Sequence, residues 1–330
     1  MGLHYVNNMR GIAILMVIFA HALSTVKSDY LLYKVLDALT DNITLVFVAI
    51  SGYLFTSLSE NYKFSRFMSV KLKTVFLPYI VISIPAIIMY VGSFKEYHHW
   101  IDMQWFHSQL NAVEQAGLLL ITGASLGPLW FIPMIFLFFL LSPVFIYLKK
   151  HDLLGSTFAI TMLGALLFGR PQLNDNAFHS LVFFLPAYLA GMWLSTTDRW
   201  QKIPMYQHCL PVLGAYLIIA PLIHLSVDVS NSLDLLIKLF FTLLIFMVSA
   251  QYLNRKLKWL DLFARLSFFL FFVHGYMSGF FRVIYRLYFD TNGQIIYSLI
   301  AFCGILAACI VGFLITKPLL QSKSKFLIGA

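Results

Sequence analysis

Ten long apolar runs fill most of this 330-residue sequence and constrain its fold more than any other feature. Each run is about 17 to 25 residues long, the length of helix that crosses the hydrocarbon core of a lipid bilayer. Because lipid offers the backbone no hydrogen-bond partners, such runs are expected to be α-helices. The expected spans cover residues 8–27, 42–59, 74–93, 129–148, 153–169, 178–195, 209–227, 233–253, 262–281 and 295–316.

The amino-acid composition excludes a water-soluble protein. Hydrophobic residues make up 60% of the chain and charged residues only 11%, whereas soluble proteins carry about 25% charged residues. The 32 phenylalanines and 3 cysteines also exclude a disordered chain and a disulfide scaffold. We therefore expect a single domain over residues 1–330, an all-α polytopic membrane protein with about ten transmembrane helices. No cleavable signal peptide is expected, because no cleavage site follows the first run.

The net charge of +9 is divided unevenly between the two sides of the expected topology. With the N-terminus inside, the inner segments together carry +12 and the outer segments −3. Lys and Arg concentrate on the cytoplasmic side of membrane proteins, so both termini are predicted to be cytoplasmic. The basic residues lie in short clusters between apolar runs, so no nucleic-acid partner is expected. Asp234 and Lys238, four residues apart at the outer start of the eighth span, are expected to neutralise each other.

Two histidines lie inside expected spans, where an ionisable side chain costs about 2.5 to 3.5 kcal/mol on insertion scales. His21 follows Arg10 by eleven residues, which places it about 16 Å further along the first helix. His274 lies nine residues after Arg265 in the ninth span, about 13 Å from the same side of the membrane. The two imidazoles could therefore share one cavity. A neutral ring hydrogen-bonded to a backbone carbonyl is the alternative explanation for each.

The longest polar interruption, residues 94–127, is expected on the outer side and is too long to be a simple turn. An aromatic belt at the membrane interface explains its composition. A platform on which sugar rings stack explains it as well. Its aromatic and imidazole side chains are Tyr97, His98, His99, Trp100, Trp105, Phe106 and His107.

Arg10, ten residues and then His21 resemble the signature of the acyltransferase-3 family, membrane enzymes that O-acylate bacterial surface polysaccharides. Further motifs similar to those of the family follow in its order along essentially the whole chain. Many members have an arginine pair where this chain has Lys71 and Lys73, and a lysine supplies a point charge instead of a bidentate donor. The motifs are VFVAISGYLF in the second span, KFSRFMSVKLKTVFLPY before the third, GPLWFIP at the fourth and LSFFLFFVHGY in the ninth.

The resemblance implies an acyl donor in the cytoplasm, usually acetyl-CoA, and an acceptor hydroxyl on an exopolysaccharide or other envelope glycan at the outer face of the bacterial inner membrane. Coenzyme A is a polyanion, so basic residues at the inner ends of the first three spans are candidates for binding it. The positive-inside distribution accounts for the same charges without any ligand. The candidates are Arg10, Arg66, Lys71 and Lys73.

His21 is the candidate general base, because an alcohol attacks a thioester well only when its proton is removed, and imidazole titrates near neutrality. Asp41, at the outer start of the second span, is the candidate for orienting the imidazolium. Trp130 and His274 are candidates for contacting the substrate. A solvated aspartate and an interfacial tryptophan are the simpler explanations for Asp41 and Trp130. No metal is expected, because the remaining histidines lack the spacing of a structural zinc site.

The sequence thus favours an O-acyltransferase whose partners are a coenzyme A thioester, a polysaccharide or lipid-linked glycan, membrane lipid and the polysaccharide synthesis or export machinery. A secondary transporter that uses the same intramembrane histidine and arginine is the alternative. Transporters of that kind have repeated halves, and no internal repeat is apparent here. A structural subunit of an export assembly is a third hypothesis, and it requires no thioester chemistry.

Overall fold

The computed structural model describes residues 4–25, 31–41, 43–171, 175–227, 229–289 and 295–329. Within these ranges the chain is mostly helical and forms no β-strand, as the sequence predicts. Four residues of the charge count, Lys27, Asp29, Asp228 and Asp290, lie outside the described residues.

Eight helical segments of the described chain are long and apolar enough to cross a membrane. A bent pair raises this number to nine, against the ten spans expected from the sequence. The missing span is 153–169, where α10 (Leu154–Phe168) has only 15 residues. The eight segments are α1 (His4–Leu23), α2 (Leu31–Thr40) with α3 (Ile43–Ser57), α4 (Phe64–Lys71) with α5 (Leu77–Val91), α11 (Ala177–Thr196), α13 (Cys209–Ser226), α14 (Asn231–Tyr252), α15 (Lys258–Tyr288) and α16 (Ile295–Leu320).

The expected fourth span, 129–148, is not one straight helix. It consists of a 3₁₀ turn (Gly127–Trp130), α8 (Phe131–Leu140) and α9 (Ser142–Lys150). The segment Gly127–Leu140 instead pairs with α7 (Ala112–Thr122) across a 73° bend. Gly123 adopts a left-handed conformation at the end of α7, which ends the helix and turns the chain. Pro143 then opens α9, where its missing N–H costs nothing.

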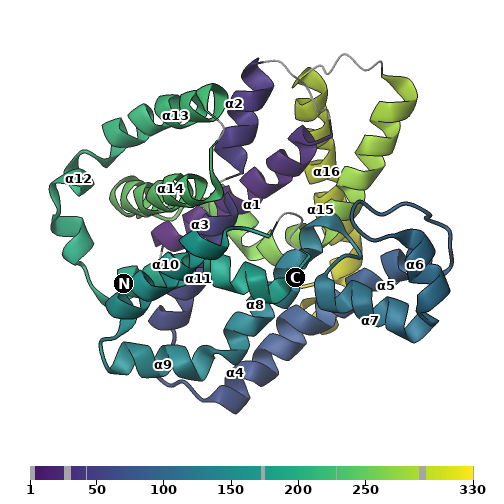
Figure 1. The fold of residues 1–330 in the computed structure, drawn as a ribbon, viewed down its shortest axis with the longest axis horizontal. Coiled ribbons are helices and arrows are strands. Elements are labelled where there is room, and N and C mark those ends of the chain that lie inside the picture. Colours follow the sequence, from purple (N-terminus) through teal and green to yellow (C-terminus); the bar gives the residue numbers. More distant parts are fainter. Residues whose placement is uncertain are drawn as a thin grey trace.

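Residues 94–127 form a compact helical cap, and the sequence analysis, which expected more than a simple turn here, did not predict its helices. Asp102 caps α6 (Met103–Gln109), and Asn111 forms a capping box with Glu114 at α7. A small apolar core, made mainly by Tyr90, Ile101, Phe106, Leu119 and Ala124, joins the cap to α5. Figure 1 shows α6 and α7 beside α5 at one edge of the molecule.

Close packing of α3 against α11 holds the centre of the bundle together (Figure 1). A β-carbon at Gly52 would collide with the carbonyl of Tyr188, and one at Gly191 would collide with the carbonyl of Ala49. Small residues at such positions let two membrane helices approach closely, and van der Waals packing then holds them. The glycine of the Ser-Gly-Tyr-Leu motif is therefore a packing residue. On the other side of the centre, α1 packs mainly along α15 and α16.

Candidate active site

A cavity of about 1060 Å³ runs between the helices in the middle of the bundle. Its wall includes residues before the start of α3, such as Asp41, and residues after its end, such as Ser59. It therefore follows the whole of α3, about 22 Å at the rise of an α-helix. We call the end near Arg10 and Arg66 the basic end, and the end near Asp41 the far end. The other walls come from α1, α4, α8, α11 and α15.

His21 lies on the cavity wall, near the end of α1. Its ring centroid is 5.0 Å from that of His274, with 53° between the ring planes. His274 is fully buried on α15, and its Nδ1 is 2.9 Å from the carbonyl oxygen of Leu270. That carbonyl accepts a hydrogen bond, so Nδ1 carries the proton and Nε2 is an acceptor. The Nε2 atom is buried and has no hydrogen-bond partner in the described part of the chain. The pairing predicted from helix rise is thus present.

Arg10 is fixed in place by α15. One guanidinium nitrogen donates to the carbonyl oxygen of Ala264 (3.1 Å) and to the hydroxyl of Ser267 (3.0 Å). Arg10 and Ser267 both line the cavity. These bonds leave further N–H groups on the guanidinium, which has five. Arg10 can therefore present charge to the cavity while staying bound to α15.

Two more of the predicted basic residues join Arg10 at the basic end. Lys71 lines the cavity, its ammonium lies 4.8 Å from the centroid of the Phe139 ring, and its charge interacts with that of Arg10. Arg66 lines the cavity and is exposed. Lys73 is exposed and is not part of the wall, which departs from the expectation that all four would converge. Side chains two positions apart on a helix point in different directions, so Lys71 and Lys73 cannot face the same cavity.

Asp41 lines the cavity at its far end, but it does not contact His21. One carboxylate oxygen pairs with the ammonium of Lys238 and the other lies 3.5 Å from the guanidinium of Arg170. Lys238 also pairs with Asp234 at 2.7 Å, as the sequence predicted for these two residues. The expected orienting role of Asp41 therefore has no hydrogen bond to support it among the described residues.

Trp130 lies on the cavity wall. Its ring stacks on Phe184, with centroids 5.8 Å apart and 29° between the planes. The guanidinium of Arg170 lies 5.8 Å from the same Phe184 ring. Sequence reasoning gave Arg170 no role, although it is a solitary cation in a short outer segment. His99, from the helical cap, also lines the cavity.

The family model of the acyltransferase-3 domain, described as an acyltransferase domain, matches residues 3–317. The chain belongs to the acyltransferase-3 family. No curated protein and no solved structure gives a significant match. With its apolar helices, this acyltransferase-3 protein is a multi-pass membrane acyltransferase. Among the described residues, no group of three or more His, Cys, Asp or Glu side chains could hold a metal ion.

The arrangement allows acyl transfer chemistry. The imidazole of His21 lies on the wall of the cavity, and a second imidazole that can accept a hydrogen bond lies beside it. Basic side chains cluster at one end of the same cavity, where they can bind an anion. An aromatic ring and an ion-paired carboxylate lie toward the other end, and both are common contacts for a polar organic ligand.

Proposed function

We propose that this membrane acyltransferase takes an acetyl or other acyl group from coenzyme A in the cytoplasm and transfers it to a hydroxyl of a bacterial exopolysaccharide or another envelope glycan. One observation carries the proposal. Arg10 and Lys71 at the basic end share a single cavity with His21, which lies about 16 Å further along α1.

The basic end suits the donor. Coenzyme A carries several phosphate charges, and Arg10, Arg66 and Lys71 offer charge-assisted hydrogen bonds to them. An extended pantetheine arm can then run along the cavity toward His21. The wall on the way includes apolar side chains such as Val17 and Phe271, which exclude water from the thioester.

His21 serves as the general base in this proposal. A hydroxyl proton of the acceptor passes to an imidazole nitrogen while the hydroxyl oxygen bonds to the thioester carbonyl carbon. The carbon–sulfur bond then breaks, and the departing sulfur takes the proton from the imidazolium to leave as the coenzyme A thiol. The base is thereby restored and no other reactant is needed. Such proton transfer contributes about 10² to 10⁴ in rate.

His274 assists as a positioning residue. With Nδ1 donating to Leu270, its Nε2 can accept a hydrogen bond from an N–H of His21. That bond would select one tautomer of His21 and stabilise the imidazolium during transfer, as a third group does in hydrolase triads. The sequence analysis expected Asp41 to have this orienting role.

The acceptor enters from the far end, where Trp130 lines the cavity and offers an apolar face to a sugar ring. In this proposal the far end faces the outside of the bacterial inner membrane, so donor and acceptor approach from opposite sides. The protein then acts beside the enzymes that make or export the glycan.

The test uses purified protein in lipid vesicles with radiolabelled acetyl-CoA and a panel of glycan acceptors. We expect free thiol to appear together with label on the glycan. His21→Ala should lower transfer by about 10² to 10⁴. Coenzyme A affinity should be nearly unchanged, because the basic end is about 16 Å away. Wild-type transfer by a folded His21→Ala variant rejects the mechanism. Transport of a solute without thiol release would favour the transporter hypothesis.

A further inference from the structure

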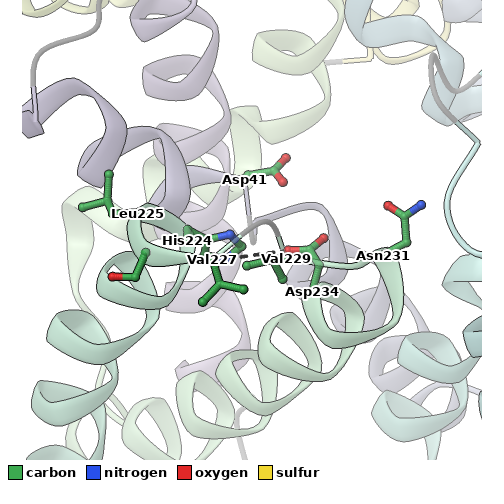
Figure 2. Close-up of a pocket in the computed structure, with 8 residues that line it drawn as sticks. Asp41, His224, Leu225, Val227, Val229, Asn231 and Asp234 are labelled. Carbon is green, nitrogen blue, oxygen red and sulfur yellow. Dashed lines mark ion pairs between the residues drawn. The ribbon is translucent and has the colours of Figure 1, made fainter.

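A second, open pocket of about 530 Å³ lies beside the far end of the cavity. Figure 2 shows the polar side chains around it, with His224 at the end of α13 facing Asp234 at the start of α14. Its volume is within the range of small-molecule sites. The pocket is lined by Asp41, His224, Leu225, Ser226, Val227, Val229, Asn231 and Asp234.

We call this second pocket the outer pocket. Asp41 connects it to the candidate active site. This residue is part of the wall of both the cavity and the outer pocket. A ligand that occupies the outer pocket therefore lies next to anything that fills the far end of the cavity. A chain-like acceptor could occupy both at once, with one unit near His21 and the next unit in the outer pocket.

The charges around the pocket favour a neutral ligand. Asp41 and Asp234 carry two negative charges, and Lys238 and Arg170 balance them. The Lys238 side chain is only 3% exposed, whereas that of Asp41 is 51% exposed. The pocket therefore presents carboxylate oxygens and hides the ammonium. Such a surface accepts hydrogen bonds from hydroxyl groups and repels phosphate or carboxylate.

The remaining groups also match a sugar. Asn231 is exposed on the pocket wall and offers two donors and an acceptor on one amide. The Nε2 atom of His224 lies 3.8 Å from Asp234, too far for a hydrogen bond, so this ring is also available to a ligand. Val227 and Val229 offer apolar contacts for C–H faces.

We propose that the outer pocket is a subsite for the glycan acceptor and that it holds the neutral sugar unit next to the one that is acylated. This inference rests on the proposed function, because it names a further part of the same acceptor site. Lys238 and Arg170 hold Asp41 between the two sugar units. Asn231 and His224 bind hydroxyls of the outer unit.

The experiment compares short and long acceptors. The probes are a neutral hexose and its trisaccharide, taken from the series that the wild-type protein acylates. Asn231→Ala and His224→Ala should each raise the KM of the trisaccharide by about three- to tenfold, the effect of one lost hydrogen bond. The KM of the monosaccharide, the coenzyme A affinity and kcat should stay unchanged. Asn254→Ala, at an exposed position outside both the cavity and the outer pocket, is the matched control.

Equal effects on both acceptors, or none on the trisaccharide, overturn the subsite. Binding of the trisaccharide without any donor separates this failure from failure of the proposed function. Suppose that wild-type protein binds the trisaccharide, that Asn231→Ala weakens this binding, and that no glycan is acylated. The proposed reaction is then rejected, and the assignment of the outer pocket as a sugar-binding site is supported. If the two variants instead change binding only to vesicles rich in anionic lipid, the pocket binds headgroups and the proposal fails.

Discussion

The imidazole ring of His274 lies 5.0 Å from that of His21 and is buried, with one nitrogen bound to its own helix and the other without a partner. Burying a polar atom without a hydrogen bond costs free energy. The cost is offset if the atom gains a partner during the reaction. His274 is buried and is not part of the cavity wall, so in the proposed mechanism it acts on His21 and not on the substrate.

Replacing His274 tests this relationship. His274→Phe keeps the bulk of the ring and removes the acceptor, so kcat should fall by about tenfold or more while coenzyme A affinity stays the same. His274→Gln, which retains a hydrogen-bond acceptor, should recover part of the loss. Single-turnover kinetics and donor titrations measure the two quantities. Ser278→Ala removes only a hydroxyl that donates to the His274 carbonyl, and it is the control. Full activity in His274→Phe would exclude a positioning role.

The basic end offers a matched pair of lysines. Lys71→Ala should weaken coenzyme A binding by about 10- to 100-fold, because a charged hydrogen bond contributes about 1.5 to 3 kcal/mol. Lys73→Ala removes the same charge from an exposed position outside the cavity and should change the affinity less than twofold. Arg10→Ala should resemble Lys71→Ala. Isothermal titration with coenzyme A measures the affinity of each variant. Equal losses for the two lysines would show that only the overall charge matters.

The buried lysine at the far end should be important for stability. Lys238→Met leaves Asp234, and partly Asp41, without its counter-ion, and breaking a buried pair costs about 3 to 5 kcal/mol. Because half of the Asp41 side chain is exposed, we expect the lower end of this range. Thermal unfolding in detergent measures it. Arg265→Ala breaks an exposed pair with Asp261 and should cost less than about 1 kcal/mol. If Lys238→Met and Arg265→Ala lowered the free energy of unfolding by similar amounts, the ion pairs of Lys238 would behave as solvent-exposed pairs, contrary to this prediction.

The helical cap should loosen in acid. His98 donates from Nε2 to Ala124 and accepts from the backbone N–H of Ile101, so the fold holds it neutral. Burial is the main cause that lowers the pKa of His98 to about 4, against its ordinary 6.5. The unfolded cap binds a proton more readily, so the contribution of His98 is complete above pH 6.5 and is lost as the pH falls toward 4.

Hydrogen exchange of the Ile101 and Phe106 amides, followed between pH 7 and pH 4 and corrected for intrinsic rates, should report this loss. In His98→Ala the protection should be weak throughout and should not change with pH. Constant protection of the wild-type cap over this interval contradicts the prediction.

Helix length and rise were enough to predict that His21 and His274 lie side by side. The separation of Arg10 and His21 on α1, and the matching depth of His274 on α15, follow from counting residues. The face that each helix turns inward was harder to predict. The two-residue spacing of Lys71 and Lys73 shows that they cannot both face the cavity, but only the packing of α4 and the segment after it decides which one reaches the wall.

Partners at the far end could not be predicted from local spacing. Asp234 and Lys238 are four residues apart on one helix, so their ion pair can be predicted from the sequence. The pairing of Lys238 with Asp41 joins segments that are distant along the chain, and a uniformly apolar helix carries little information about which neighbour it meets. The same difficulty applies to the 73° bend after α7, where capping and glycine conformation override the apolar pattern of the fourth span.

A cavity whose wall extends from Arg66 to Asp41 has a consequence for the cell as well as for the reaction. If water filled it from end to end, protons and other ions could cross, and the electrochemical gradient would drain through every copy of the protein. If the two ends open to opposite sides of the membrane as proposed, the aromatic side chains on the wall, among them Phe47, Phe131 and Phe271, keep the cavity impermeable when no substrate is bound. In the proposed mechanism, the apolar residues that exclude water from the thioester therefore also insulate the membrane.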